Sequence, residues 1–273
     1  MLRIRKILNN NAVIVMDNDQ EKIALGPGVG FNKQKQDIVV RSTVEKLFVL
    51  KEHEKLQQLL ERIPEKHFML SEDIIRHAEK ELGTRINEHI LIMLTDHVSF
   101  AIERLKEGIH VKNKLLQEIK ILYKQEFAIG QWAIKHIEEQ TQIKMPIDEA
   151  AFIALHIHMM KLKGGDLRQT VRQTTIVSEM VERIETCLGI SVHEDDIAYE
   201  RLIMHLHFAL TRTKQFHNHV MDEDMLQMIQ SKYQTSHQCA RTMANEIFAA
   251  YEIDFPEEEL GYITLHIERL RQG

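Results

Sequence analysis

An internal repeat in the last two thirds of the chain constrains the fold more than any other feature of the sequence. Residues 146–157 align with residues 256–267 at a shift of 110, and residues 97–104 align with residues 205–212 at a shift of 108. Self-similarity at a fixed period is typical of duplicated structural units. The sequence therefore predicts two successive units of about a hundred residues each that share one fold.

The repeated region has the pattern of helices. After residue 55 apolar residues recur at spacings of three and four, and proline occurs only three times. This pattern predicts long amphipathic helices, with a first helix over residues 56–63 that Pro64 ends. The only Gly-Gly pair of the chain, at 164–165, marks a boundary between the two units. We expect two all-α helical bundles, over residues 58–166 and 167–273.

The first 57 residues have a different pattern, that of short strands separated by turns rich in Asn, Asp and Gly. Alternating or β-branched segments predict a small four-stranded antiparallel β-sheet in the head, residues 1–57. The expected strands are Leu2–Leu8, Ala12–Met16, Lys22–Leu25 and Glu45–Leu50. Such short strands bury one face of a sheet, and so small a core is marginal. A second copy would supply the missing cover, so we expect an obligate homodimer.

Charge is distributed unevenly between the head and the rest of the chain. The formal net charge is −6, but residues 1–55 hold ten Lys and Arg against seven Asp and Glu, or +3, which leaves −9 for the remainder. A basic head on an acidic body indicates that one domain binds a polyphosphate. No apolar run approaches the ~18 residues of a membrane span, and the two cysteines do not suggest a disulfide framework. We therefore expect a cytoplasmic protein without membrane insertion.

The repeat also preserves histidines. Of the 16 histidines, four recur in register in the two units, namely His97, His156, His205 and His266. One alternative is that they are core residues whose rings bond to the backbone. Their neighbours have changed between the repeats while the imidazoles have not, which favours a functional role.

A metal site is a second alternative, because three His-x-His pairs occur in the helical region. Residues two apart on a helix point about 200° apart, so they cannot share one ion as residues four apart could. His158 and His207 also lack histidine counterparts in the other repeat. The third pair is His217 and His219. We expect no metal ion and no other cofactor.

Catalysis is not indicated either. No Ser or Cys lies in a nucleophile elbow, and neither Cys187 nor Cys239 recurs in the repeat. The glycines Gly26, Gly28 and Gly30 lack the spacing of a dinucleotide-binding loop, and no helical pattern follows them. The chain is not expected to be an enzyme.

The remaining chemistry is acceptance of a phosphoryl group. Neutral imidazole is a good nitrogen nucleophile near pH 7, and a phosphoryl group on it adds about two negative charges. Between two facing protomers that charge can repel or clamp them, which makes a switch. Asp96, next to His97 in the chain, is a candidate to orient that ring.

These segments together resemble the BglG/SacY family of bacterial antiterminators over essentially the whole chain. The head resembles the family's co-antiterminator RNA-binding domain, a four-stranded antiparallel sheet that works as a symmetric dimer. The motifs are Ile7-Leu-Asn-Asn-Asn-Ala12, Leu25-Gly-Pro-Gly-Val-Gly-Phe-Asn-Lys33 and Asp37-Ile-Val39. The helical repeats resemble its two phosphotransferase-system regulation domains, or PRDs. Their motifs are 87–90, Asp96-His-Val-Ser-Phe-Ala-Ile102, Ala154-Leu-His-Ile-His158, Tyr199-Glu-Arg-Leu-Ile-Met-His205 and Tyr262-Ile-Thr-Leu-His-Ile267.

The resemblance implies a set of RNA-binding residues in the head. Asn side chains can bond base edges, Gly permits close backbone approach, and Phe can stack on an unpaired base. Taken without the resemblance, the same residues could equally form a turn and part of a core. Pro27 stands where some relatives carry a basic residue, so the resemblance implies no phosphate contact at this position. The implied contacts are Lys6, Asn9, Asn11, Gly26, Gly28, Phe31 and Lys33.

The resemblance also implies the regulation. His97, His156, His205 and His266 would be phosphorylation sites, the first two served by a sugar-specific enzyme II permease and the last two by the phosphocarrier HPr. With sugar present the dimer would hold a hairpin in leader mRNA and prevent a terminator from forming. Two rival functions remain: a DNA-binding activator built on PRDs, which needs a helix-turn-helix head, and a His-rich metalloprotein. The sugar and the role of His207 are open.

Overall fold

The structure is a computed structural model that describes residues 2–18, 20–49, 62–85, 88–159, 167–190, 197–212 and 221–272. Three expectations fall outside these residues. They are residues 56–61 of the helix expected over 56–63, the boundary at 164–165, and the pair His217 and His219.

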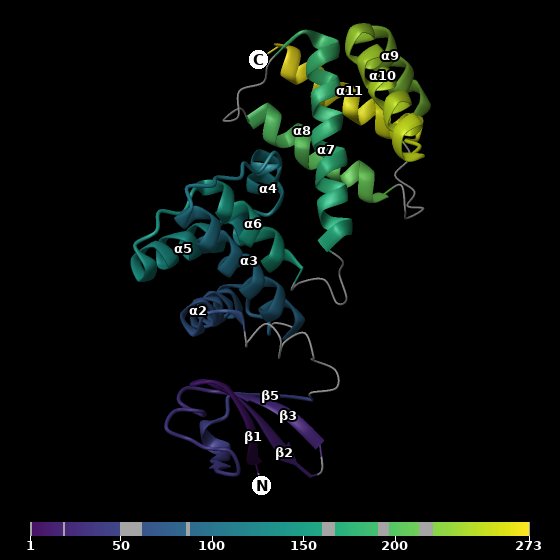
Figure 1. Ribbon diagram of the computed structural model, residues 1–273. Coiled ribbons are helices and arrows are strands. Elements are labelled where there is room, and N and C mark those ends of the chain that lie inside the picture. The colour runs from purple at the N-terminus through teal and green to yellow at the C-terminus, as the bar shows by residue number, and fades with distance from the viewer. Residues whose placement is uncertain are drawn as a thin grey trace. The chain divides into compact units, whose positions relative to one another are not determined.

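The head is an antiparallel sheet, as the strand pattern predicts (Figure 1). Its strands follow the order β4-β1-β2-β3-β5 across the sheet. A tight turn at Asn10 and Asn11 joins β1 to β2, with Asn9 facing Ala12 across the ladder. The strands are β1 (Leu2–Asn9), β2 (Ala12–Asp17), β3 (Gln20–Leu25), β4 (Ile38–Val39) and β5 (Lys46–Val49).

The sheet has five strands in the described residues, and not the four that the sequence predicts. The additional strand is β4, which pairs with the start of β1 through Leu2–Val39 and Arg3–Ile38. A two-residue strand is too short to show alternation, so its pattern cannot be recognised in the sequence.

The expectation that only one face of the sheet is buried is also wrong. Val13 and Val15 of β2 belong to a core with Leu2 and Ile4 of β1. Ile14, which points to the opposite face, is buried as well. The central strand is therefore covered on both faces within the chain.

From residue 65 onward the described residues form helices, as the repeat predicts. Pro64 is the N-cap of the first of them, where its fixed φ and missing N–H are tolerated. The helices are α2 (Glu65–Leu82), α3 (Glu88–Lys106), α4 (Leu116–Leu122), α5 (Lys124–Thr141), α6 (Ile147–His158), α7 (Leu167–Leu188), α8 (Ile197–Arg212), α9 (Glu223–Lys232), α10 (Gln234–Tyr251) and α11 (Glu257–Gln272). Every helix in the described part is too short or too polar to cross a lipid bilayer.

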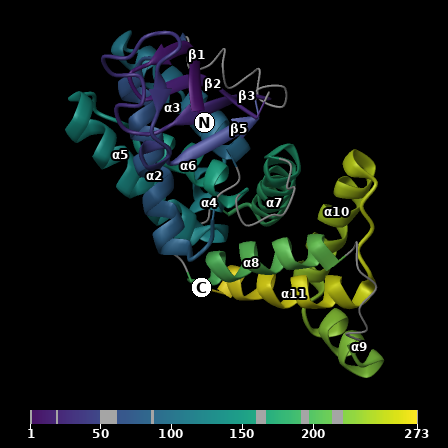
Figure 2. The same ribbon diagram turned by 90° about the horizontal axis from the view of Figure 1, so that it is seen from below.

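The chain folds into two compact units, whose bounds differ from those of the two sequence repeats. The first comprises residues 1–111 and 131–149, and the second comprises residues 112–130 and 150–273. In the second unit α8 and α11 run side by side (Figure 2), and apolar residues of α7, α8, α10 and α11 share one core. This packing sets His205 of α8 against the helix that carries His266.

Candidate functional sites

In the head, the Asn-rich turn and the Gly-rich loop are fastened to each other. The Gly28 N–H donates to the Asn11 side-chain oxygen over 2.6 Å. The Gly26 N–H donates to the Asn11 carbonyl over 3.0 Å, and the Gly30 N–H donates to the Asn10 carbonyl over 2.8 Å. Residues that are 15 or more positions apart in the chain thus form one surface at the end of the β1–β2 hairpin.

Two of the predicted glycines have conformational reasons to be glycine. A Cβ atom on Gly26 would lie 2.0 Å from the Thr43 carbonyl oxygen, so no larger residue fits there. Gly28 has a φ of +68°, a left-handed conformation that side chains disfavour. Gly26 is buried and Gly28 is exposed, so Gly28 is the one whose backbone can be approached from outside.

The remaining head residues differ in exposure. Phe31 follows this loop and its side chain is 59% exposed. Lys33 is exposed two residues later, and Lys6 is exposed on β1 opposite Ile14. Asn9 is half-buried, and its side-chain oxygen accepts the Asn11 N–H over 2.9 Å. The surface therefore combines two ammonium groups, an open aromatic ring and the Asn11 amide, whereas the side-chain nitrogen of Asn9 is buried.

In the first unit, His97 faces a buried carboxylate. Its Nε2 lies 3.3 Å from Oε2 of Glu149, whose side chain is fully buried. The other oxygen of Glu149 forms an ion pair with Arg104, whose side chain is 9% exposed. Phe100 lies under the Arg104 guanidinium at 5.7 Å. His97 and Arg104 come from α3 and Glu149 comes from the first turn of α6.

The second unit repeats this arrangement. Nε2 of His205 lies 3.6 Å from Oε2 of Glu259, and Arg212 forms an ion pair with Oε1 of Glu259 over 3.2 Å. His205 and Arg212 come from α8, and Glu259 comes from the first turn of α11. We call the two arrangements the first cluster (His97, Glu149, Arg104) and the second cluster (His205, Glu259, Arg212).

Two predicted histidines meet in the second unit. The rings of His205 and His266 stack with centroids 4.6 Å apart. Burial lowers the pKa of His205 to about 4, helped by the nearby Arg212 charge. Burial also lowers the pKa of His266 to about 4, with His205 and two arginines adding to the effect. Both imidazoles are therefore neutral at pH 7, which is the nucleophilic form.

The other predicted and open histidines lie on the same helices. His156 is half-buried on α6, with its Nδ1 buried. His158, two residues later, contacts Glu126 through Nδ1 at 3.0 Å. His207 is half-buried on α8, and burial lowers its pKa.

Asp96 does not have the role proposed for it. Its side chain is exposed, while the carboxylate that faces the His97 ring is that of Glu149, more than 50 residues away in the chain. On a helix, consecutive residues point in different directions, so the residue next to a histidine rarely orients its ring. The relevant signal was in the repeat, which preserves Glu149 as Glu259 and Arg104 as Arg212.

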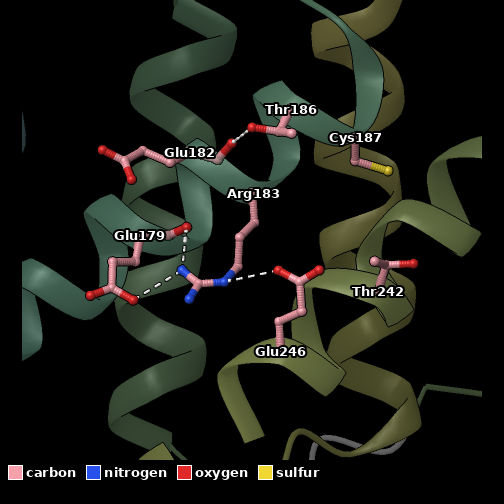
Figure 3. Close-up of a pocket in the computed structure, with 7 residues that line it drawn as sticks. All are labelled: Glu179, Glu182, Arg183, Thr186, Cys187, Thr242 and Glu246. Atoms are coloured by element: carbon pink, nitrogen blue, oxygen red, sulfur yellow. Dashed lines mark hydrogen bonds and ion pairs between the residues drawn. The ribbon is translucent and has the colours of Figure 1, made fainter. Parts of the chain in front are cut away.

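Two further features bear on what the described residues could bind. Within the described residues, no three His, Cys, Asp or Glu side chains gather in a way that could hold a metal ion. A surface pocket lies between α7 and α10 (Figure 3), where Arg183 bridges Glu179 at 3.0 Å and Glu246 at 3.1 Å. With Glu182 also lining it, the pocket carries three carboxylates against one arginine, which disfavours an anion.

The chain is similar to known domains along most of its length. The model of the CAT RNA binding domain matches residues 2–57, and the model of the PRD domain matches twice, at residues 72–159 and 178–270. These matches cover the sheet and both histidine clusters.

Similar proteins and a solved structure agree with these matches. The transcription antiterminator LicT of Bacillus subtilis strain 168 is 35% identical over 274 residues, which cover 98% of this chain and 99% of LicT. The beta-glucoside operon antiterminator of Dickeya chrysanthemi is 36% identical over 278 residues, which cover 99% and 97%. The crystal structure of GlcT CAT-PRDI aligns with a TM-score of 0.54 at 36% identity, over 59% of this chain and 99% of that one.

Proposed function

The chain belongs to the family of transcription antiterminators that join a CAT RNA-binding domain to PRD domains, and from this premise we propose how its residues carry out that function. It is a sugar-responsive transcriptional antiterminator and not an enzyme, and its PRDs imply regulation through the sugar phosphotransferase system. The rival DNA-binding activator needs a helix-turn-helix head. The described head is a sheet whose one helical element is the short 3-10 turn Arg41–Thr43.

We propose that the head binds a hairpin of the leader mRNA through the protein surface at the turn between β1 and β2. The observation that supports this is the bond from Gly28 to Asn11, which fixes the loop and leaves the Phe31 ring open to solvent. An open ring can stack on an unpaired base, and Lys6 and Lys33 can neutralise phosphates. Asn11 reads a base edge and Asn9 positions it, while Gly26 shapes the loop and Gly28 permits close approach. We also propose that the protein is a homodimer. Its affinity for RNA should fall as the salt concentration rises, because basic side chains neutralise RNA phosphates.

Substitution of Phe31 tests this RNA surface in the full chain. Loss of one base–aromatic stack costs about 1–3 kcal/mol, so Phe31→Ala should weaken hairpin binding about 5- to 150-fold. Val40→Ala is the matched control, because Val40 is an equally exposed apolar residue of the head, at 58%. Affinity for hairpin RNA is measured by titration at fixed salt. Equal affinity of Phe31→Ala and Val40→Ala would remove Phe31 from the RNA site.

We propose that His97, His156, His205 and His266 accept phosphoryl groups. The neutral, stacked rings of His205 and His266 support this, because only neutral imidazole has the lone pair for attack. The donors are an enzyme II permease for His97 and His156, and HPr for His205 and His266. The domains end near residues 57 and 166, and the protein works in the cytoplasm.

Phosphate transfer in vitro tests the regulatory part. The full chain is incubated with phosphorylated HPr, with and without a β-glucoside-type enzyme II, and acid-labile sites are mapped by mass spectrometry. Label on the four histidines is the expected result. Label confined to other histidines, such as His158 or His207, would contradict the assignment.

A further inference from the structure

The two clusters point one particular ring nitrogen of each histidine at a carboxylate. In the second cluster both facing atoms, His205 Nε2 and Glu259 Oε2, are buried, and neither has a hydrogen-bond partner elsewhere in the described part of the chain. Their separation of 3.6 Å is longer than an ordinary hydrogen bond but short enough to close with a small side-chain shift. The first cluster shows the same pair of atoms at 3.3 Å.

A proton between these two atoms resolves an electrostatic conflict. If Nε2 carried the lone pair, that lone pair would face a buried carboxylate oxygen, and both atoms would lack a donor. With the proton on Nε2, the ring donates and the carboxylate accepts. Arg212 pairs with the other oxygen of Glu259 and fixes the carboxylate in place.

We propose that Glu149 and Glu259 are positioning residues for phosphoryl transfer: each holds the Nε2 proton of His97 or His205, so that Nδ1 carries the lone pair and takes the phosphoryl group. This inference rests on the proposed function of these histidines as acceptors. The arrangement uses the same physics as a carboxylate that fixes the tautomer of a catalytic histidine.

The transfer step balances without any further reactant. The Nδ1 lone pair forms the new N–P bond while the N–P bond of the donor phosphohistidine breaks, and that electron pair returns to the donor ring. The Nε2 proton stays where it is, so the acceptor ring becomes a cation next to the Glu259 carboxylate. Because a protonated phosphoimidazole is a good leaving group, the carboxylate also keeps the transfer reversible.

The isomer of phosphohistidine formed on His205 tests the proposal directly. A chain with His97, His156 and His266 replaced by Gln is labelled with phosphorylated HPr and digested in alkali. Chromatography then separates the Nδ1 and Nε2 isomers of free phosphohistidine. The Nδ1 isomer is the expected product. A dominant Nε2 isomer would overturn the inference while leaving His205 as an acceptor.

Variants of Glu259 separate positioning from folding. Glu259→Ala should slow labelling about 10- to 100-fold, as loss of an orienting partner does, and should yield both isomers. Glu259→Gln keeps an oxygen that can accept the Nε2 proton and should restore the Nδ1 isomer. Glu258→Gln, on the same turn of α11, is the control and should match the parent chain. An unchanged isomer ratio in Glu259→Ala would contradict the proposal.

Failure of the underlying function gives a different result. If His205 takes no label in the otherwise unaltered chain, while circular dichroism shows the helices intact, His205 is not an acceptor. The proposed role of Glu259 then falls with it.

Discussion

The first and second clusters contain the same three side chains but differ in how far water reaches them. Glu149 is fully buried and Arg104 is 9% exposed, whereas Glu259 is 12% exposed and Arg212 is 40% exposed. Removing one partner of a buried ion pair lowers the free energy of unfolding by several kcal/mol, because the other charge stays buried without a partner. An exposed pair contributes at most about 1 kcal/mol. The two repeats therefore keep the same side chains at the site but differ in how much the Arg–Glu ion pair contributes to stability.

A backbone contact differs between the repeats in the same sense. A Cβ atom on Gly130 of α5 would lie 2.2 Å from the Ala150 carbonyl oxygen on α6. At the matching places the second repeat has Ala240 and Leu260, so a Cβ is accommodated there. The contact of α5 with the helix that supplies Glu149 therefore requires a glycine, whereas the matching position beside the helix that supplies Glu259 accepts an alanine.

The largest expected difference comes from removing the two arginines. Arg104→Ala leaves the Glu149 carboxylate buried and unpaired, and should lower the free energy of unfolding by about 3–5 kcal/mol. Arg212→Ala should cost about 1 kcal/mol or less. Urea unfolding of each full-length variant, followed by circular dichroism, measures both losses. Equal losses would mean that the two ion pairs do not differ as their burial indicates.

A smaller difference is expected from the backbone contact. Gly130→Ala forces α5 and α6 apart, and overpacking of this kind costs about 1–3 kcal/mol. Ala240→Gly creates no clash and should cost about 1 kcal/mol through helix propensity. The same urea experiment compares the two. A neutral or stabilising Gly130→Ala would show that the close approach is not required.

At neutral pH the smallest effect is that of the stacked pair His205 and His266, because their contribution to stability changes only as the pH falls. The pKa of His205 and of His266 is about 4 in the folded chain, against 6.5 for an ordinary imidazole. Between those values the unfolded chain binds protons that the folded chain does not, so stability should fall as pH drops from about 6.5 towards 4. It should be unaffected by these two groups above that range.

Thermal unfolding between pH 7.5 and 4.5 measures this slope. Replacing both His205 and His266 with Gln should flatten it, while the variant with Gln at His110, an exposed histidine, should retain it. A parent chain and a double variant with the same slope would remove the buried pair as the cause.

The sequence predicts the sheet, the helices and the register of the four histidines, because each depends on local periodicity or on repetition. It misses β4, since two residues have no period, and it assigns the orienting carboxylate to Asp96 instead of Glu149. The latter contact joins α3 to α6, and only packing decides which distant side chain reaches a ring. Comparison of the repeats contained the signal, because Glu149 and Glu259 are both preserved, but spacing alone does not show that they face the histidines.

The most direct test of the whole account is RNA affinity as a function of phosphorylation. The full chain is labelled on His97 and His156 by enzyme II, and its affinity for hairpin RNA is compared with that of the unlabelled chain at one salt concentration. The account predicts binding weaker by about tenfold or more, the size of a coupling free energy between distinct sites. Stoichiometric label on both histidines with unchanged RNA affinity would contradict it.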